Sequence, residues 1–265
     1  MSANPYFPDP SSHTPADLRR DLADRLCLGG SAWFYTLLSR YILRSRSEAL
    51  AGTYDREAWA RASRDIMGAL ERCGGRFRIE GLEHVRDLAA PVVFVSNHMS
   101  TVETMTFPCL IAPFRPVTFV VKESLVTMPI FGPVMRACDP VTVGRRNPRE
   151  DMQKVLEDGT ARLQDGISII LFPQSTRQVE FVPEKFNSLG VKLARRAGVQ
   201  VVPVAIKTDF WQPGRLVKDF GPLRRREPIH MRFGAPLSIT GNGRDEHQAI
   251  LAFIMENLAA WQGSA

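Results

Sequence analysis

A histidine and a carboxylate separated by four residues form the part of this chain best suited to acid–base chemistry. They lie in the segment Asn97–Glu103, which reads NHMSTVE. Histidine titrates near neutral pH, so His98 can take the proton of an alcohol as that alcohol attacks a carbonyl carbon. A carboxylate on the other ring nitrogen, here Glu103, would fix the tautomer and stabilise the imidazolium as it forms. The pair therefore predicts general-base catalysis without a protein nucleophile.

The spacing of this pair restricts where the two side chains can meet. Five steps along an ideal helix rotate a side chain by about 140°, so His98 and Glu103 cannot share one helical face. They can meet if His98 lies in a turn and Glu103 in the first turn of the next helix. Ser100–Glu103 also fits a capping box, with Ser100 as the N-cap. Glu103 therefore has a structural interpretation beside the catalytic one.

The elements that must position this pair are short β-branched runs alternating with helical stretches. The expected strands cover residues 77–80, 92–95, 117–121, 141–143, 167–172, 201–206 and 229–233. The expected helices cover residues 101–110, 130–137, 149–163, 186–196 and 245–261. Several of the strands are apolar on both faces. The pattern predicts an α/β fold with a largely parallel central sheet covered by helices on both faces, and with an N-terminal helical hairpin.

Open α/β sheets place their reacting groups beyond the carboxyl ends of the strands, which directs attention to the residues after each strand. His98 follows the second expected strand, Lys122 the third and Arg145 the fourth. The fifth is followed by the segment Pro173–Arg177. A histidine and three cations at four strand ends form a coherent candidate site.

The composition is that of an ordinary folded protein. Of 265 residues, 44% are hydrophobic and 23% are charged, and the net charge of +6 favours an anionic membrane, a phosphorylated substrate or nucleic acid. We expect a disordered lead-in over residues 1–15, a helical membrane-associating segment over 16–75 and an α/β domain over 76–265. The four cysteines form no CxxC pair and no zinc-type cluster, so we expect free thiols and no metal.

One uncharged stretch, residues 26–39, has features of a membrane-interface helix. It is too short to span a bilayer, which needs about 20 apolar residues. It contains Trp33, Phe34 and Tyr35 and is flanked by arginines, and such residues suit the headgroup region of an anionic membrane. The alternative is a helix that packs against the protein's own core.

Several blocks of the α/β part resemble the glycerolipid acyltransferases, whose best known members are the lysophosphatidic acid acyltransferases. The segment Asn97–Glu103 is similar to the H-x4-D signature of that family. Val141–Arg145 resembles its second block, and FPQSTR at Phe172–Arg177 resembles its third, which usually reads FPEGTR. Val201–Ile206 resembles the fourth block, and Lys122–Gly132 matches the family's K-x-x-L...P...G stretch. The blocks occur in the family's order, which makes the joint match specific although each block alone is weak.

The resemblance implies roles for these residues. His98 would be the general base and Glu103 its orienting carboxylate. Lys122 and Arg177 would hold the phosphate of a lysophospholipid acceptor and Arg145 would help to shape that site, because guanidinium and ammonium groups bind phosphate oxygens. An acyl thioester, acyl-CoA or acyl carrier protein, would be the co-substrate, with no resident cofactor. The protein would then work at an anionic membrane surface, peripherally and on the cytoplasmic side, without a nucleic-acid partner.

Three positions depart from the family's pattern. Glu103 replaces aspartate, Gln174 replaces glutamate and removes a negative charge beside the expected phosphate site, and Ser175 replaces glycine. With Thr176 and Arg177, the residues Gln174 and Ser175 are expected to line the acceptor site. The departures leave the identity of the acceptor open.

Two other functions fit parts of the sequence. A thioesterase would cleave the same donor with water, although the chain has no G-x-S-x-G elbow for a serine nucleophile. A non-catalytic protein that binds anionic lipid or nucleic acid would use the basic charge, but no helix-turn-helix, RNA-recognition or zinc motif is present. P-loop and dinucleotide fingerprints are also absent, so we expect no bound nucleotide cofactor.

Overall fold

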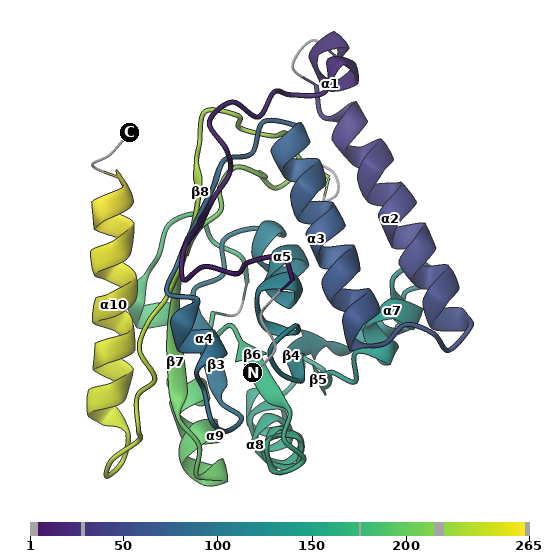
Figure 1. Cartoon of the computed structure of the whole chain (residues 1–265). Helices are drawn as coiled ribbons and strands as arrows, with labels where there is room; N and C mark the ends of the chain where they lie inside the picture. Colours follow the sequence, from purple (N-terminus) through teal and green to yellow (C-terminus); the bar gives the residue numbers. More distant parts are fainter. Residues whose placement is uncertain (1–4, 28–29, 175, 215–219, 263–265) are drawn as a thin grey trace.

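The computed structural model describes residues 5–27, 30–174, 176–214 and 220–262, which are built around one sheet (Figure 1). Within these ranges the sheet has eight strands in the order β1-β2-β8-β7-β3-β6-β4-β5. The strands are β1 Ser12–His13, β2 Phe77–Glu80, β3 Val93–Ser96, β4 Val117–Lys122, β5 Val141–Val143, β6 Ser168–Leu171, β7 Val201–Lys207 and β8 Ile229–Phe233. Strands β7, β3, β6, β4 and β5 are parallel neighbours, while the pairs β1–β2 and β7–β8 are antiparallel. The predicted, largely parallel sheet is confirmed.

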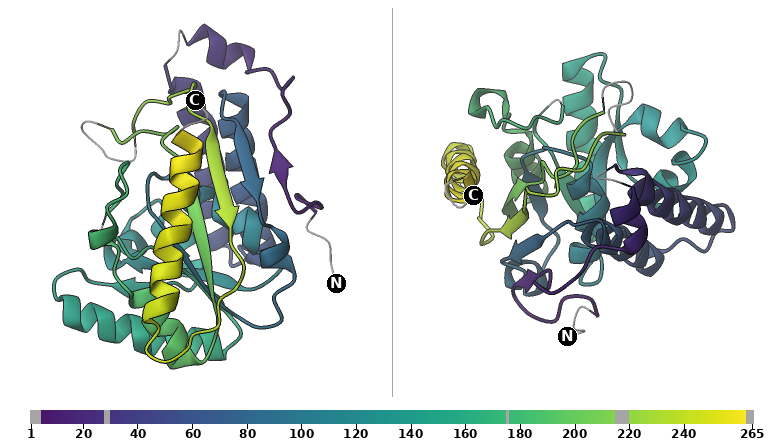
Figure 2. Two further views of the ribbon diagram at one scale, coloured as in Figure 1. Left: turned by 90° about the vertical axis from the view of Figure 1, so that its left-hand side faces the viewer. Right: turned by 90° about the horizontal axis from the view of Figure 1, so that it is seen from above.

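Helices cover both faces of the sheet, as predicted. They are α1 Leu22–Leu26, α2 Ala32–Leu50, α3 Arg56–Arg72, α4 Glu83–Arg86, α5 Val102–Ile111, α6 Glu123–Thr127, α7 Gly132–Ala137, α8 Pro148–Gln164, α9 Leu189–Ala197 and α10 Arg244–Gln262, with a 3-10 turn at Pro183–Lys185. Helix α5 lies against α3, and α3 against α2, on one side of the sheet (Figures 1 and 2). Helices α8, α9 and α10 contact strands from the other side. Right-handed crossovers explain this division, because the chain moves one way along the sheet through α5 and the opposite way through α8 and α9.

The central strands supply the core. All residues of β3 and β6 are buried, which explains why their sequences are apolar without alternation. The same hydrophobic cluster contains Phe94 and Ile170 of the sheet and Phe34 and Leu70 of α2 and α3. The N-terminal helices therefore share a core with the α/β part. They pack on the side of the sheet that α5 covers.

The segment expected to be a disordered lead-in is ordered over the part that the structure describes. Ser12 pairs with Ile79 and His13 with Arg78, which adds β1 to the edge of the sheet. Phe7 is buried in the core. An edge strand such as β2 exposes unpaired backbone groups, and β1 satisfies them. Composition alone missed this strand because two residues are too few to form a recognisable pattern.

The aromatic cluster of α2 faces the protein, which matches the alternative of a helix packed against the protein's own core and not a cluster that lies in a membrane. Phe34 is completely buried, and it packs edge-on against Trp211 at 4.8 Å between ring centroids. The Trp33 indole donates to Asp21 at 2.8 Å, and the Tyr35 hydroxyl donates to the carbonyl of Gly221 at 2.5 Å. An interfacial helix and a packed helix share one amphipathic pattern, so the sequence could not distinguish them. In the described ranges, no helix has the length and apolarity needed to cross a membrane.

Candidate active site

The carboxyl ends of parallel strands bring the predicted site residues to one edge of the sheet. His98 lies two residues beyond β3, Arg177 follows β6, Lys122 ends β4 and Arg145 lies two residues beyond β5. Strands lie about 4.8 Å apart, so Lys122, two strands from His98, and Arg145, three strands away, have backbones roughly 10 and 15 Å from the histidine. Lys122 and Arg145 therefore lie on the β5 side of His98, whereas Arg177 reaches Thr101 at the start of α5, close to the histidine. At that distance from His98, Lys122 and Arg145 can bind a remote group of a substrate, whereas they are too far away to contact the atoms that react beside the imidazole.

The predicted contact between His98 and Glu103 is present. His98 Nδ1 lies 2.8 Å from Glu103 Oε1. His98 is in the turn after β3 and Glu103 is the second residue of α5, the arrangement that the spacing requires. The His98 side chain is 15% exposed whereas that of Glu103 is fully buried. Because the carboxylate holds Nδ1, Nε2 is the ring nitrogen left for proton transfer to a substrate.

Several hydrogen-bond donors converge on the Glu103 carboxylate. Oε1 accepts from the backbone N–H groups of Met99 at 2.7 Å and Ser100 at 2.8 Å. Oε2 accepts from the hydroxyls of Thr208 at 2.7 Å and Ser100 at 3.1 Å. Burial by itself would raise the pKa of Glu103, but the hydrogen bonds from His98 and Thr208 outweigh it and hold the pKa below its usual value. Glu103 therefore stays ionised beside the histidine.

The capping interpretation of Glu103 holds together with the contact to histidine. The N-cap of α5 is Thr101 rather than the expected Ser100. The Ser100 hydroxyl accepts from the N–H of Val102 at 3.0 Å, and Glu103 in turn accepts from the N–H of Ser100. One carboxylate thus satisfies backbone donors at the start of the helix and binds the imidazole.

An aromatic ring fixes the plane of the imidazole. The His98 ring stacks on Phe172 with centroids 4.2 Å apart and an interplanar angle of 18°. The Phe172 ring lies nearly parallel to those of Phe107 and Phe119, at 6.1 and 6.2 Å. The stack restricts rotation of the imidazole about its Cβ–Cγ bond, so Nε2 keeps one direction.

The third motif lies directly against the histidine. Gln174 is buried, and its Oε1 accepts from the backbone N–H of His98 at 2.7 Å. Because a backbone N–H donates to it, the amide atom facing His98 is the oxygen, and the second amide atom is the donor Nε2. Gln174 Nε2 is buried and has no hydrogen-bond partner among the described residues. The Arg177 guanidinium reaches the Thr101 hydroxyl at the start of α5. Thr176 is exposed, and Ser175 lies outside the described residues.

The second motif forms a tight turn beyond β5. Arg145 has a φ of 60°, in the left-handed region that few non-glycine residues adopt. The N–H groups of Gly144 and Arg145 both donate to the carboxylate of Asp151 in α8, each at 2.9 Å. Lys122 lies beside Val143 in the register of β4 and β5. Lys122 and Arg145 are thus neighbours at one end of the edge, and both side chains are exposed.

Two residues that hold this site were not found from the sequence. The sequence pattern places Asp151 in the expected helix 149–163 and gives Thr208 no motif. The strand-end rule could have indicated Thr208, since it directly follows β7. Within the described part of the chain, no three His, Cys, Asp or Glu side chains are grouped as metal ligands.

Comparison with known proteins fits this geometry. The sequence profile of the Acyltransferase family matches residues 76–207, which contain His98, Glu103 and all four motif blocks. Through these residues the chain belongs to the acyltransferase family. The predicted family resemblance is confirmed.

Individual relatives are named for one kind of acyltransferase. The chain is 30% identical over 162 residues to a 1-acyl-sn-glycerol-3-phosphate acyltransferase of Pseudomonas aeruginosa, an alignment that covers 58% of this chain and 61% of the relative. It is 30% identical over 131 residues to a chloroplastic 1-acyl-sn-glycerol-3-phosphate acyltransferase of Arabidopsis thaliana, covering 49% and 36%. The chain therefore spans less than two thirds of the length of either relative.

A solved structure shows the same fold. The crystal structure of the 1-acyl-sn-glycerophosphate acyltransferase PlsC from Thermotoga maritima matches with a TM-score of 0.66 at 18% identity, covering 90% of this chain and 96% of that one. The match includes most of the chain, so the shared fold extends beyond the residues that the family profile covers.

Proposed function

We propose that this acyltransferase-family protein moves a fatty acyl chain from a thioester donor to the free hydroxyl of a lysophospholipid such as lysophosphatidic acid. The observation that carries the proposal is the His98–Glu103 pair, whose Nδ1 to Oε1 distance is 2.8 Å, at the strand-end edge of a family domain. The printed names of the relatives in Pseudomonas aeruginosa and Arabidopsis thaliana support the choice of acceptor.

The chemistry follows from the orientation of His98. The acceptor hydroxyl attacks the thioester carbonyl carbon while Nε2 takes its proton, and Glu103 stays ionised and stabilises the imidazolium. The tetrahedral intermediate then loses the thiolate as the carbon–sulfur bond breaks. The imidazolium returns its proton to the departing sulfur, so the products are an ester and a free thiol. The protein forms no covalent bond at any step.

The cations at the strand-end edge would bind the acceptor's phosphate. Lys122 and Arg177 are the proposed phosphate ligands, and Arg145 lies next to Lys122 in the turn that Asp151 holds. A glycerol backbone separates the reacting hydroxyl of a lysophospholipid from its phosphate, which agrees with the position of Lys122 two strands from the base. Gln174, whose Oε1 accepts from the His98 backbone N–H, adds a neutral donor beside the base.

The donor is proposed to be acyl-CoA or an acyl carrier protein, and the reaction needs no resident cofactor because general-base chemistry is supplied by the chain's own residues. The four cysteines are free thiols, which agrees with the reducing environment of the cytoplasm where such donors occur. Nucleic acid has no role in the proposal.

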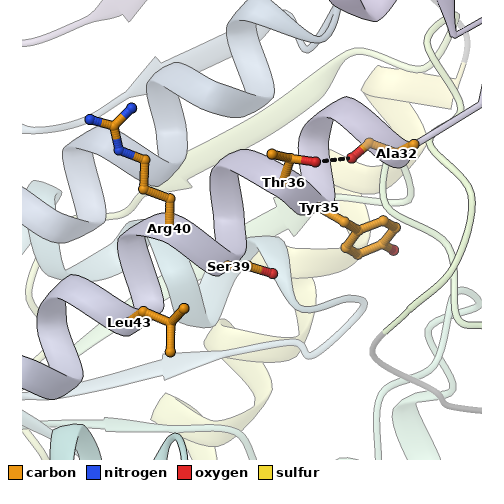
Figure 3. A pocket seen from close by; sticks show the side chains of 6 residues that line it. All are labelled: Ala32, Tyr35, Thr36, Ser39, Arg40 and Leu43. Carbon is orange, nitrogen blue, oxygen red and sulfur yellow. Dashed lines mark hydrogen bonds between the residues drawn. The ribbon is translucent and has the colours of Figure 1, made fainter.

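We further propose peripheral membrane association through the outer surface of α1 and α2. Leu22 and Leu26 of α1 and Leu43 and Leu50 of α2 are between 55% and 72% exposed. Arg40 lies on the same outer face of α2, beside Leu43, in a shallow groove of about 650 Å³ (Figure 3). The groove contains none of the candidate catalytic residues. Exposed leucines among arginines suit the surface of an anionic bilayer.

The decisive experiment combines purified protein with both donor types and a panel of lyso-acceptors, with products identified by mass spectrometry. We expect a diacyl product with lysophosphatidic acid or a related acceptor. His98→Ala should lower turnover by about 10²–10⁴-fold, the usual contribution of a general base.

Other outcomes would contradict the proposal. Release of free thiol at the same rate with and without acceptor would indicate a thioesterase. Undiminished activity of folded His98→Ala protein would exclude the mechanism. Lipid or nucleic-acid binding with no turnover under any condition would indicate a non-catalytic binding protein.

A further inference from the structure

Thr208 is a fully buried residue that directly follows β7 and lies just outside the region matched by the family profile. Its hydroxyl donates to Glu103 Oε2 at 2.7 Å. The contact joins the end of β7 to the carboxylate that binds His98. No motif block of the sequence includes this residue.

Two hydroxyl groups can donate to Glu103 Oε2, and Thr208 is the principal donor of the two. The Ser100 hydroxyl has one proton, and it lies 3.1 Å both from Glu103 Oε2 and from the Thr208 hydroxyl oxygen. Ser100 can therefore donate to the carboxylate or to Thr208, but not fully to both. If its proton goes to Thr208, the bond from Thr208 alone satisfies Oε2. In either case Thr208 makes the shorter bond.

The position of Thr208 is fixed by contacts between β7 and the turn that carries His98. The Asn97 side chain accepts from the N–H of Ile206 and donates to its carbonyl, both at 2.9 Å. The backbone N–H of Thr208 points to the Met99 sulfur at 3.2 Å. These contacts hold the end of β7 against residues 97–99. Thr208 thus presents its hydroxyl from a rigid strand end rather than from a mobile loop.

We propose that Thr208 is a positioning residue that orients the Glu103 carboxylate toward His98 and keeps that carboxylate ionised while the imidazole carries a proton. The effect on turnover rests on the proposed function, whereas the effect on the histidine does not. Thr208 touches no substrate atom in this scheme and acts only through Glu103.

The sign of the pH effect follows from the hydrogen bond. A donor to a carboxylate stabilises the anion, so its loss makes proton binding by the coupled His98–Glu103 pair more favourable. In a variant without the Thr208 hydroxyl, the acid limb of the pH profile of kcat should therefore move to higher pH. Among the described residues, the pair is also faced by the positive N-terminal end of α5, by the backbone donors of Met99 and Ser100 and by the Ser100 hydroxyl, and the Arg177 guanidinium lies nearby on Thr101. The charged neighbours Lys207 and Asp209 pair with each other at 2.9 Å, and Lys207 also pairs with Glu227 at 2.8 Å.

The test compares Thr208→Val, which keeps the shape and removes the hydroxyl, with Thr208→Ser, which retains it. A hydrogen bond to a charged group corresponds to about 10- to 100-fold in rate, so Thr208→Val should lose that factor in kcat, with little change in acceptor KM. Thr208→Ser should restore most of the rate and the wild-type pH profile. Thr118→Val is the matched control, because Thr118 is also buried and, among the described residues, its hydroxyl donates to the backbone carbonyls of Cys138 and Asp139 and to no carboxylate.

An NMR titration of the histidine ring separates this inference from the proposed function. The chain has five histidines, and the His98 signal is identified by its loss in His98→Ala. In Thr208→Val, the His98 titration should move to higher pH even if the wild-type protein transfers no acyl group. An unchanged His98 titration in folded Thr208→Val, or an equal shift in Thr118→Val, would overturn the assignment. If Thr208→Val does not fold, Thr208→Ala takes its place in the same measurement.

Discussion

Glu103 combines a structural and a chemical role that one substitution can separate. In Glu103→Gln, the amide oxygen can still accept from His98 and the backbone, and the amide nitrogen can donate to the hydroxyls of Ser100 and Thr208. The negative charge is lost. We expect turnover to fall about 100-fold or more while the melting temperature changes by only a few degrees. Parallel kinetics and thermal melts test this, and near-normal turnover would mean that Glu103 serves the helix start alone.

The proposed phosphate ligands predict a selective loss of acceptor binding. Lys122→Ala and Arg177→Ala should each cost about 1.5–3 kcal/mol with a phosphorylated acceptor, as for a hydrogen bond between charged groups. The KM for the donor should change little. Arg195→Ala on the exposed surface of α9 is the control, and it should leave both constants unchanged. A loss confined to the donor would show that these cations bind the thioester substrate instead.

The residues that could be predicted at this site are those whose relation is local. His98 and Glu103 lie within one short segment, and helix geometry restricts how they meet. Thr208 could not be placed in the same way, because its contact depends on the pairing of β7 with β3, in which Ser96 lies opposite Val204. Partners brought together only by strand register leave no local spacing in the sequence.

At the scale of elements, the hydrophobic pattern was sufficient for the buried strands and long helices. The expected strands 92–95 and 201–206 differ from β3 and β7 by one residue at their ends. The short helices α4 and α6 were missed, since four or five residues carry no helical period. The sequence left two orientations of α2 open because the same aromatic residues suit a membrane interface or the protein's own core, and the contact of Phe34 with Trp211 decides between them.

The outward face of α2 gives an element-scale prediction about membranes. Leu43 and Leu50 lie seven residues apart and therefore on one face, and both are exposed. Leu43→Glu combined with Leu50→Glu should reduce sedimentation with anionic vesicles several-fold while leaving turnover on a water-soluble acceptor unchanged. Met255→Glu, on the exposed surface of α10, is the control. Equal sedimentation of all three proteins would exclude this face as the membrane contact.

At the scale of the whole molecule, ion pairs join the N-terminal helices to distant segments, and one of these pairs contains a fully buried aspartate. Asp24 of α1 is fully buried and binds Arg20 and, at 2.8 Å, Arg225 of the segment before β8. Asp21 pairs with Arg72 at the end of α3, but that pair is partly exposed. Removing one partner from a buried pair leaves an uncompensated charge, which costs several kcal/mol. The membrane hypothesis is therefore tested with surface substitutions, since deleting these helices would also remove Phe34 from the core.

A buried histidine of β8, outside the motif blocks, makes the stability of the whole chain depend on pH. His230 of β8 stacks on Trp261 of α10 with centroids 4.9 Å apart. Burial, together with the positive charges of Arg78 and Lys207, lowers its pKa to about 4, against only a small opposing effect from Asp209. The unfolded chain, with a histidine pKa near 6.5, then binds more protons than the folded chain between these values.

The free energy of unfolding should therefore decrease as pH falls from about 6.5 to about 4, by at most about 3 kcal/mol from this residue. Carboxylates with lowered pKa values, such as Glu103 and Glu227, add to the loss at the acid end of this range. His230→Phe keeps an aromatic ring against Trp261 but cannot titrate, so the difference between the two proteins isolates the histidine. Denaturant unfolding of both proteins at several pH values provides the measurement. The variant should lose less stability than the wild type over this range, and parallel pH curves would show that His230 does not link folding to protonation.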